Sequence, residues 1–256
     1  MDYERFKQTI YSMTGIDLSC YKEKQMKRRI DSLITRHKAN GYDDFITLIK
    51  NDSAVFEEFV AYLTINVSEF YRNSEQWEYM NKTVFPELIA KFGTNLRIWS
   101  AACSTGDEPY SLVMALSKHL PLSKINIHAT DIDAQILDKA RMGLYGSKSI
   151  ENLPKEHLDK YFDLIAGSYQ IKNEIKSHVE FEKHNLLADS YPKNQHLIVC
   201  RNVLIYFTDE AKDLIFRKYY DSLERGGYLF IGSTEQIMNY DKIGYVRKNS
   251  FFYQKP

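Results

Sequence analysis

Two acidic residues at the start of a helix are the first feature with a clear chemical meaning. Residues 98–112, IWSAACSTGDEPYSL, have the pattern of a buried strand, a tight polar turn and a helix that opens with Asp107 and Glu108. Nucleotide-binding α/β proteins place their cofactor loop in such a turn, but the dinucleotide fingerprint needs three glycines and this turn has only Gly106. Two carboxylates there suit the helix dipole, and they would repel a diphosphate. The turn therefore favours either a structural role for these acids or a ligand with a positive group and no phosphate.

A third carboxylate, Asp131, follows the next predicted strand. At that position of a nucleotide-binding fold, a carboxylate can accept hydrogen bonds from both hydroxyls of a ribose. The alternative is that Asp131 or Asp133 only caps the helix that follows. In combination with the turn at 101–108, Asp131 favours ribose binding. S-adenosylmethionine fits all three acids, because it carries an adenosine, an ammonium group and a sulfonium but no phosphate.

The elements that must position these residues alternate between strand and helix from about residue 94. This alternation predicts right-handed βαβ units and an α/β fold with a doubly wound, mostly parallel sheet. Ligands of such sheets bind beyond the carboxyl ends of the strands, where Asn185, Arg201 and Asn202 are also expected. Strands are predicted at 97–102, 125–132 and 228–233 and within 196–207, where LIVC precedes Arg201. The predicted helices are 108–120, 133–145 and 208–227.

Two segments of this α/β region alternate polar and apolar residues instead. Residues 167–187 predict a small antiparallel β insertion without a helix, and residues 245–255 predict an antiparallel edge strand. Residues 1–75 show helical periodicity throughout, with Ser53 as a candidate N-cap. The expected domains are an all-helical N-terminal domain at 1–75, a linker helix at 76–93, and an α/β domain at 94–256 with an antiparallel subdomain at about 147–184.

The composition excludes several classes of protein. The chain has 256 residues with 34 basic and 34 acidic side chains, so its zero net charge argues against nucleic-acid binding by the whole chain. No apolar run reaches the roughly 18–20 residues of a membrane span, and the first ten residues lack the core of a secretion signal. The three cysteines have no CxxC spacing, which favours reduced thiols in the cytoplasm over a disulfide framework or a zinc site. We expect neither a metal nor membrane insertion.

A basic helix is predicted over residues 22–38, where seven basic side chains accompany two acidic ones. Lys22, Arg29 and Arg36 fall on one stripe beside the apolar face, which contains Met26 and Ile30. A solvated helix face is the ordinary meaning of such a charge run, and a nucleic-acid patch is an alternative. The residues alone leave both interpretations open.

Five motifs, in order along the chain, resemble the CheR family of chemotaxis receptor methyltransferases. The resemblance spans essentially the whole chain, and it implies a methyltransferase fold that uses S-adenosylmethionine. It further implies that glutamate side chains on the cytoplasmic helical domain of chemoreceptors become methyl esters. The motifs are TINVSEFYR, WSAACSTGDEPYSL, ATDID, HNLL and CRNVLIYF.

The same resemblance implies a set of cofactor contacts. Arg72 suits the methionine carboxylate, Glu108 faces the cofactor and Asp131 holds the ribose. Ser68 stands where other members have threonine, and Asp107 stands where they have glutamate, which puts only the role of Asp107 in doubt. Without the resemblance, Asn66 and Ser68 could cap a helix near residue 69, Asn185 could be a turn residue and Asn202 a loop residue. The full set is Asn66, Ser68, Arg72, Glu108, Asp131, Asn185, Leu186, Asn202 and Val203.

On the substrate side, Arg201 and Tyr206 are candidates for orienting the acceptor carboxylate, although Tyr206 could equally be a core residue. The family implies that the helix with Lys22, Arg29 and Arg36 faces the acidic methylation helices of the receptor. We expect a monomer that binds no nucleic acid and no receptor C-terminal tether. The alternatives are a methyltransferase of another acceptor such as RNA, and a non-catalytic module that binds the cofactor or the receptor.

Overall fold

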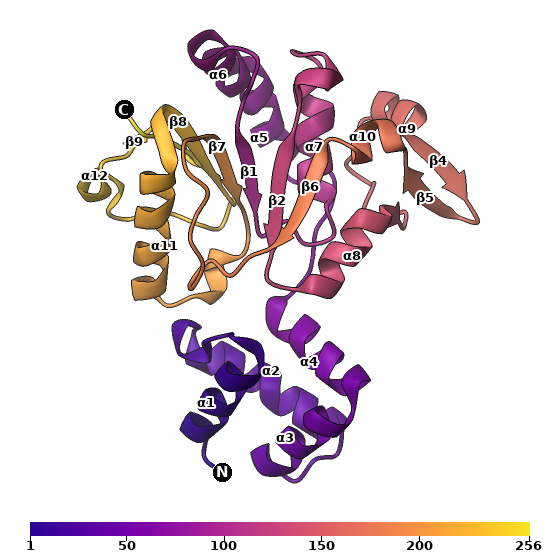
Figure 1. The fold of residues 1–256 in the computed structure, drawn as a ribbon, viewed down its shortest axis with the longest axis vertical. Coiled ribbons are helices and arrows are strands. Elements are labelled where there is room, and N and C mark those ends of the chain that lie inside the picture. Colours follow the sequence, from indigo (N-terminus) through magenta and orange to yellow (C-terminus); the bar gives the residue numbers. More distant parts are fainter. The chain divides into compact units, whose positions relative to one another are not determined.

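The computed structural model describes residues 1–256, which fall into two compact units (Figure 1). Met1–Asn66 and Tyr206–Leu214 form the first, here called the helical unit. Val67–Ile205 and Ile215–Pro256 form the second, here called the sheet unit. No helix has the length and apolar character that crossing a bilayer would require.

The helical unit is built from amphipathic helices around an aromatic core. Phe6 lies 4.8 Å from the ring of Tyr42, and Phe45 lies 5.7 Å from Phe59. The side chain of Asp52 accepts hydrogen bonds from the amides of the first turn of α4, so Asp52, and not the predicted Ser53, is the N-cap. The elements are α1 (Tyr3–Thr14), η1 (Leu18–Cys20), α2 (Glu23–Arg36), α3 (Tyr42–Asn51) and α4 (Ser53–Thr64).

The helical periodicity does not continue to residue 75. Residues 65–73 have no regular secondary structure, and the next helix begins at Ser74 instead of near residue 69. Ile65 and Asn73 both adopt left-handed backbone conformations, which a continuous helix cannot contain. There is therefore no helix near residue 69 for Asn66 or Ser68 to cap.

The sheet unit contains a seven-stranded, mostly parallel sheet, as predicted. Its first five strands are parallel, and β10 and β9 continue it in antiparallel pairing, which confirms the edge predicted from residues 245–255. The chain leaves β1 toward β2 on one side and returns to β7 on the other, so the strand order reverses between β1 and β7. In spatial order the strands are β6 (Val179–Lys183), β2 (Ile127–Asp131), β1 (Ile98–Ala101), β7 (Gln195–Cys200), β8 (Leu223–Ile231), β10 (Phe252–Gln254) and β9 (Val246–Arg247).

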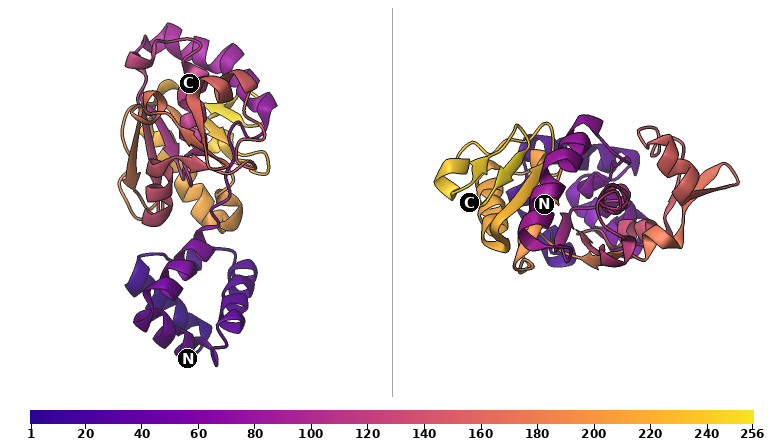
Figure 2. Two further views of the ribbon diagram at one scale, coloured as in Figure 1. Left: turned by 90° about the vertical axis from the view of Figure 1, so that its right-hand side faces the viewer. Right: turned by 90° about the horizontal axis from the view of Figure 1, so that it is seen from above.

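Helices cover both faces of this sheet (Figures 1 and 2). Successive strand residues point to opposite faces, so Ile98 joins the core cluster that contains Trp77 and Tyr110, whereas Trp99 lies 5.5 Å from Tyr219 of α11. The helix predicted over 208–227 ends at Ser222, because the residues that follow already form β8. The helices are α5 (Ser74–Tyr79), the π-helical η2 (Met80–Val84), α6 (Phe85–Phe92), α7 (Asp107–Leu116), η3 (Leu122–Lys124), α8 (Ala134–Met142), η4 (Leu204–Tyr206), α11 (Asp209–Ser222) and α12 (Tyr240–Ile243).

A separate three-stranded antiparallel sheet lies beyond the β6 edge of the main sheet (Figure 2). It consists of β3 (Leu144–Tyr145), β5 (Ser168–Ile171) and β4 (Phe162–Ile165), with α9 (Lys155–Tyr161) between β3 and β4 along the chain.

The prediction of an antiparallel stretch without a helix over 167–187 was wrong in its second half. Helix α10 (Asn173–Lys176) interrupts it, and β6 pairs parallel with β2 in the main sheet. An edge strand that is covered on one face alternates polar and apolar residues just as an antiparallel hairpin does, so the pattern could not separate the two.

Candidate cofactor-binding site

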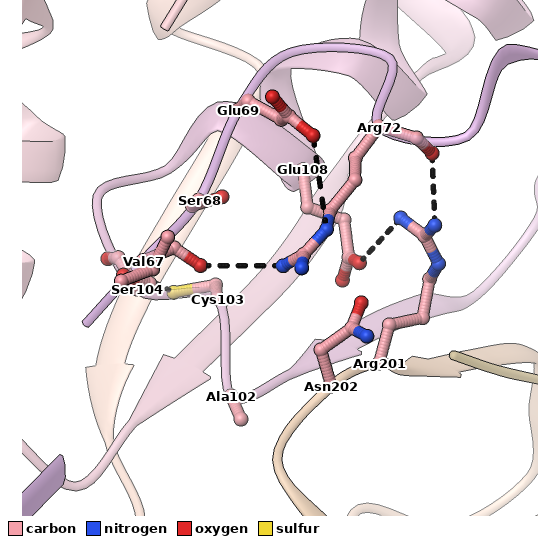
Figure 3. A pocket seen from close by; sticks show the side chains of 10 residues that line it. All are labelled: Val67, Ser68, Glu69, Arg72, Ala102, Cys103, Ser104, Glu108, Arg201 and Asn202. Carbon is pink, nitrogen blue, oxygen red and sulfur yellow. Dashed lines mark hydrogen bonds and ion pairs between the residues drawn. The ribbon is translucent and has the colours of Figure 1, made fainter. Parts of the chain in front are cut away.

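A pocket opens at the carboxyl ends of β1 and β7, where the strand order reverses (Figure 3). Three segments of the sheet unit line it: the irregular segment before α5, the turn from β1 into α7, and the residues after β7. Five of the predicted site residues meet here, although they are up to 134 positions apart in the sequence. The lining residues are Val67, Ser68, Glu69, Arg72, Ala102, Cys103, Ser104, Glu108, Arg201 and Asn202.

The turn after β1 makes its bend largely without glycine. Ala102 and Ser104 adopt positive φ angles of 81° and 49°, which cost side-chain-bearing residues energy and are held by their surroundings. The amides of Ala102 and Cys103 both donate to the carbonyl of Thr130 on β2, at 2.8 Å each. Glycine is needed only at Gly106, where φ is 87° and a Cβ would approach the Cβ of Ala140 to 3.0 Å.

Asp131 is part of the support for this turn. Its Oδ2 accepts a hydrogen bond from the amide of Ser104 at 2.9 Å, and its Oδ1 accepts one from the amide of Asp133 at 3.1 Å. Asp133, in contrast, caps α8 by accepting from the amides of Gln135 and Ile136. Burial raises the pKa of Asp131 to about 6, against the lowering effect of these amide hydrogen bonds. Of the two acids, Asp133 is the helix cap and Asp131 adjoins the pocket through Ser104.

Glu108 forms a buried ion pair at the base of the pocket. Its Oε2 lies 3.6 Å from Nη1 of Arg201, and its Oε1 accepts a hydrogen bond from the hydroxyl of Ser100 at 2.8 Å. Burial raises the pKa of Glu108, while the charge of Arg201 and the hydrogen bond from Ser100 act in the opposite direction. The pocket therefore has an acidic group that a positively charged ligand could share with Arg201.

One guanidinium nitrogen of Arg201 is committed to the protein, whereas its Nε is buried without a hydrogen-bond partner. Its Nη2 donates to the carbonyl of Arg72 at 2.8 Å, to Oδ1 of Asn73 at 3.0 Å and to Oε1 of Gln76 at 3.1 Å. The guanidinium also lies 4.7 Å from the ring centroid of Phe230, and the residue is 7% exposed. These contacts anchor Arg201 in the sheet unit, and its direct contact with the substrate stays a prediction.

Arg72 differs from Arg201, because its backbone is held by the protein while its guanidinium is largely free of strong contacts. Its backbone is fixed, because its carbonyl accepts from Arg201 and from Nε1 of Trp77 at 3.0 Å. Its guanidinium is about one-third exposed, 3.8 Å from Oε1 of Glu69, with one long 3.5 Å contact to the carbonyl of Val67. Such weak internal contacts leave this cation available to an anionic ligand in the pocket (Figure 3).

The donor set fits S-adenosylmethionine. Arg72 offers a cation for a carboxylate, Glu108 offers an acid for an ammonium group, and Asp131 retains lone pairs for ribose hydroxyls. The hydroxyl of Ser104, which lines the pocket, is buried without a hydrogen-bond partner in the protein. A buried polar atom of this kind indicates a site that a polar ligand completes.

Asp131 and the remaining predicted cofactor contacts are not among the residues that line the pocket. Oδ1 of Asn185 accepts from the amide of Leu187 at 3.0 Å, which is the turn role that the sequence analysis kept as an alternative. Leu186 is buried and Val203 is partly exposed. Asn66 belongs to the helical unit, where its Nδ2 donates to Oγ1 of Thr64 at 2.9 Å.

The predicted substrate-side residues Lys22, Arg29, Arg36 and Tyr206 all belong to the helical unit. The amide of Lys22 donates to the carbonyl of Tyr206 at 2.9 Å. The guanidinium groups of Arg29 and Arg36 lie 4.3 and 5.4 Å from the ring centroid of Tyr62, so both cations are partly engaged within the unit.

Two residues that sequence reasoning missed shape the end of β7. The carboxylate of Glu235 accepts hydrogen bonds from three backbone amides, those of Asn202 at 3.0 Å, Leu204 at 2.7 Å and Gly232 at 2.7 Å. A Cβ at Gly232 would approach the amide nitrogen of Asn202 to 2.7 Å, so only glycine fits there. A glutamate in the polar segment after the strand at 228–233 was the available signal, but nothing in the sequence says that it turns back toward Asn202.

Asp107 is the other acid of the turn, and it does not line the pocket. It is fully buried, its Oδ2 accepts a hydrogen bond from the hydroxyl of Thr105, and its Oδ1 has no partner. Burial raises the pKa of Asp107 to about 6, and the hydrogen bond from Thr105 acts in the lowering direction. Asp107 is therefore buried beside the pocket, whereas Glu108 lines it.

Comparison with known proteins assigns both parts of the chain. Residues 1–64 match the family described as "CheR methyltransferase, all-alpha domain", and residues 66–251 match "CheR methyltransferase, SAM binding domain". A chemotaxis protein methyltransferase of Listeria innocua is 43% identical over 254 residues, which cover 99% of this chain and 97% of that protein. Its counterpart in Listeria monocytogenes is 42% identical over the same coverage. One of Salmonella typhimurium is 32% identical over 93% of this chain and 84% of its own length.

Proposed function

Because this chain belongs to the CheR methyltransferase family, we propose that it methylates glutamate side chains of chemoreceptors and so forms glutamate methyl esters. It is a methyltransferase of chemotaxis that uses S-adenosylmethionine. The observation that carries the proposal is the pairing, in one pocket, of the available cation of Arg72 with the acidic group of Glu108. This pairing complements the carboxylate and the ammonium group at the amino-acid end of the cofactor.

Each end of the cofactor has a residue suited to it. The guanidinium of Arg72 binds the methionine carboxylate, Glu108 binds the ammonium group, and Asp131 accepts from the ribose hydroxyls. When bound, S-adenosylmethionine supplies an electrophilic methyl group on a positively charged sulfur. Asn66, Asn185, Leu186, Asn202 and Val203 stay predicted contacts of the adenosine and methionine parts, on the strength of the family resemblance.

The acceptor needs little chemical activation. A glutamate carboxylate has a pKa of about 4.3 and is ionised at neutral pH, so the protein need not remove a proton from it. The task left to the chain is to orient one carboxylate oxygen and to exclude water from it. Tyr206 and Arg201 are our candidates for orienting the acceptor carboxylate. The Nη2 of Arg201 already makes three hydrogen bonds within the protein, so its other guanidinium nitrogens would have to make the contact.

The basic face of α2 is the proposed surface for the receptor. Lys22 and Arg36 are exposed there, and opposite charge on acidic receptor helices would speed encounter. We expect methylation of the receptor to slow as the salt concentration rises, because salt screens the attraction between exposed charges. The Debye length is about 10 Å at 0.1 M and becomes shorter at higher ionic strength. The expectations of a monomer in the cytoplasm, without nucleic acid and without a receptor tether, remain predictions.

The direct test is transfer of a labelled methyl group. The protein is incubated with methyl-labelled S-adenosylmethionine and the cytoplasmic fragment of a chemoreceptor, and in parallel with total RNA. We expect base-labile label on the receptor fragment, mapped to glutamates by mass spectrometry, and none on a control fragment in which those glutamates are replaced by alanine. Label on RNA would support the other-acceptor alternative, and cofactor binding without any transfer would support the non-catalytic one.

A further inference from the structure

We propose that the small antiparallel insertion, residues 144–171, positions the cofactor loop, residues 67–73, and that His157 is the positioning residue, acting through Tyr71. The inference rests on the proposed function, because it assumes that the pocket lined by this loop binds S-adenosylmethionine. It goes beyond that function by giving the insertion a part in cofactor binding.

The cofactor loop has no regular secondary structure that would fix its backbone. It contains no helix or strand, and Tyr71 and Asn73 have φ angles of 49° and 59°, in the left-handed region that side chains disfavour. Residues in such conformations persist only where the surrounding structure fixes them. Arg72, whose guanidinium lines the pocket, lies between these two residues.

Tyr71 is fixed at both of its ends. Its amide donates to the hydroxyl of Ser111 on α7 at 3.1 Å. Its phenol oxygen lies 2.9 Å from Nδ1 of His157 on α9, and both side chains are buried. The ring of Tyr71 is also 5.0 Å from that of Trp77 and 5.5 Å from that of His157. A helix of the insertion thus holds the residue next to Arg72.

The protonation states suit this hydrogen bond. Burial lowers the pKa of His157 to about 4, so its imidazole is neutral at pH 7, and burial raises the pKa of Tyr71 well above its usual value. Nε2 of His157 lies 3.6 Å from Oε1 of Glu156, which favours the proton on Nε2 and leaves Nδ1 as the acceptor for the tyrosine hydroxyl.

Four further contacts join the insertion to the two segments that line the pocket. The amide of Phe70 donates to the carbonyl of Ser149 at 2.9 Å, and its ring meets those of Tyr145 and Phe162 edge-on at 4.7 and 5.3 Å. The hydroxyl of Tyr145 donates to the carbonyl of Thr105 at 2.8 Å, in the turn that forms another wall of the pocket. The insertion therefore contacts both the loop and the turn.

Pre-organisation is the physical consequence. When the loop already has its binding conformation, the ligand does not have to order it, and no conformational entropy is lost on binding. The apparent affinity is proportional to the fraction of molecules whose loop has that conformation. By reciprocity, any change in the insertion that loosens Tyr71 weakens cofactor binding, and cofactor binding in turn steadies the insertion.

The test is a double-mutant cycle on the full chain, read by calorimetry with S-adenosylhomocysteine. Tyr71→Phe and His157→Phe should each weaken binding about fivefold, the change that the loss of one hydrogen bond produces, and the double variant should be no weaker than either. His157→Asn, whose side-chain oxygen takes the place of Nδ1, should restore most of the affinity. Tyr169→Phe, which removes a hydroxyl from β5 of the same insertion, is the matched control and should bind as the wild type does.

A purely structural role would give a different pattern. If His157 and Tyr71 position the loop, their variants should raise the KM for S-adenosylmethionine and retain kcat at saturating cofactor. The fluorescence of Trp77 should also change, because its Nε1 donates to the carbonyl of Arg72. Lower thermal stability with unchanged affinity in Tyr71→Phe and His157→Phe would overturn the inference. If His157→Phe fails to fold, Tyr71→Phe, which removes one oxygen atom, decides alone. Failure of the proposed function would show in the wild type, as absent binding or absent methyl transfer.

Discussion

The turn after β1 and the cofactor loop both line one pocket, but different kinds of contact hold their backbones. In the turn, the amides of Ala102, Cys103 and Ser104 donate to Thr130 and Asp131 at the end of the adjacent strand. In the cofactor loop, Phe70 and Tyr71 are held by Ser149, His157 and Ser111, and the carbonyl of Arg72 by Arg201. These partners come from other elements, the last of them 129 positions along the chain.

The turn is thus a local wall of the pocket, a product of the α/β fold, whereas the cofactor loop is a distant wall, assembled from parts far apart in the chain. The turn follows once β1 and β2 pair, because a parallel strand pair brings their carboxyl ends together. The loop needs α7, α9 and the end of β7 to be in place first. We therefore expect the loop to be the more sensitive of the two to substitutions far from the pocket.

The largest effect is expected from Arg201→Ala, which should break the distant wall. The change removes three hydrogen bonds to the loop region and leaves the carboxylate of Glu108 buried without its cation. Loss of one partner of a buried pair costs about 3–5 kcal/mol, so the free energy of unfolding in urea should fall by that order and cofactor binding should be lost. Arg201→Lys keeps the charge but not the fork of donors, so its unfolding free energy and cofactor affinity should lie between those of the wild type and Arg201→Ala. A loss below about 1 kcal/mol would contradict the anchoring role of Arg201.

Arg72→Ala should separate binding from stability within the same wall. Its guanidinium is about one-third exposed and makes only long internal contacts, so the free energy of unfolding should change by less than about 0.5 kcal/mol. The affinity for S-adenosylhomocysteine should fall about tenfold or more, as expected for a charge-assisted hydrogen bond to the ligand carboxylate. Calorimetry and urea denaturation of the same sample check both halves. Wild-type affinity in this variant would remove Arg72 from the site.

Asp131, which supports the turn after β1, should make the affinity for the cofactor depend on pH. With the pKa of Asp131 raised to about 6, the free protein takes up a proton there as the pH falls, and the protonated acid accepts poorly from ribose hydroxyls. Affinity for S-adenosylhomocysteine should therefore be steady above pH 7 and fall about tenfold by pH 5. The raised pKa of Glu108 acts in the same direction. Asp131→Asn should bind more weakly at pH 7 and show a shallower decline, and equal slopes for the two proteins would exclude Asp131 as the titrating group.

The smallest effect concerns the backbone of the turn itself. Gly106→Ala should cost about 1 kcal/mol of unfolding free energy, because φ at this position is 87° and the new methyl group would crowd Ala140 and Tyr110. Ala102→Gly is the matched opposite, since it relieves a side chain at φ 81°, and it should be neutral or slightly stabilising. Thermal denaturation compares the two. If Ala102→Gly destabilised the protein as much as Gly106→Ala does, the turn would not be governed by backbone conformation.

The sequence predicted the local wall better than the distant one. The strand–turn–helix pattern located the turn with Gly106 and Glu108, and the acid after the second strand led to Asp131. For the loop, the family motif pointed to Ser68 and Arg72, but the periodicity suggested a helix near residue 69 where the structure has none. Helical periodicity records which residues are buried, and the aromatic residues of this segment are buried without being helical.

Other differences also arise where one residue's role depends on a partner far along the chain. Arg201 follows a strand end, which predicts that it faces the ligand, and the structure adds that its Nη2 donates to the carbonyl of Arg72, to Asn73 and to Gln76. Glu235 went unnoticed, because its three amide donors come from two different strand ends. The pattern at 179–183 predicts a strand of the antiparallel insertion, whereas β6 pairs parallel with β2, because an edge strand and a hairpin share one pattern of alternation.

By itself, the sequence determined the α/β class, the helical N-terminal part, the turn at 101–108 and the family. These follow from periodicity, from turn chemistry and from motifs, all of which act over a few neighbouring residues. Only the tertiary structure decided which buried polar groups pair, and so gave Arg201 and Glu235 their anchoring contacts and His157 its contact with Tyr71. Burial obliges such groups to find hydrogen-bond partners, but the partner is whichever group the fold brings within about 3 Å, and sequence spacing does not record that distance.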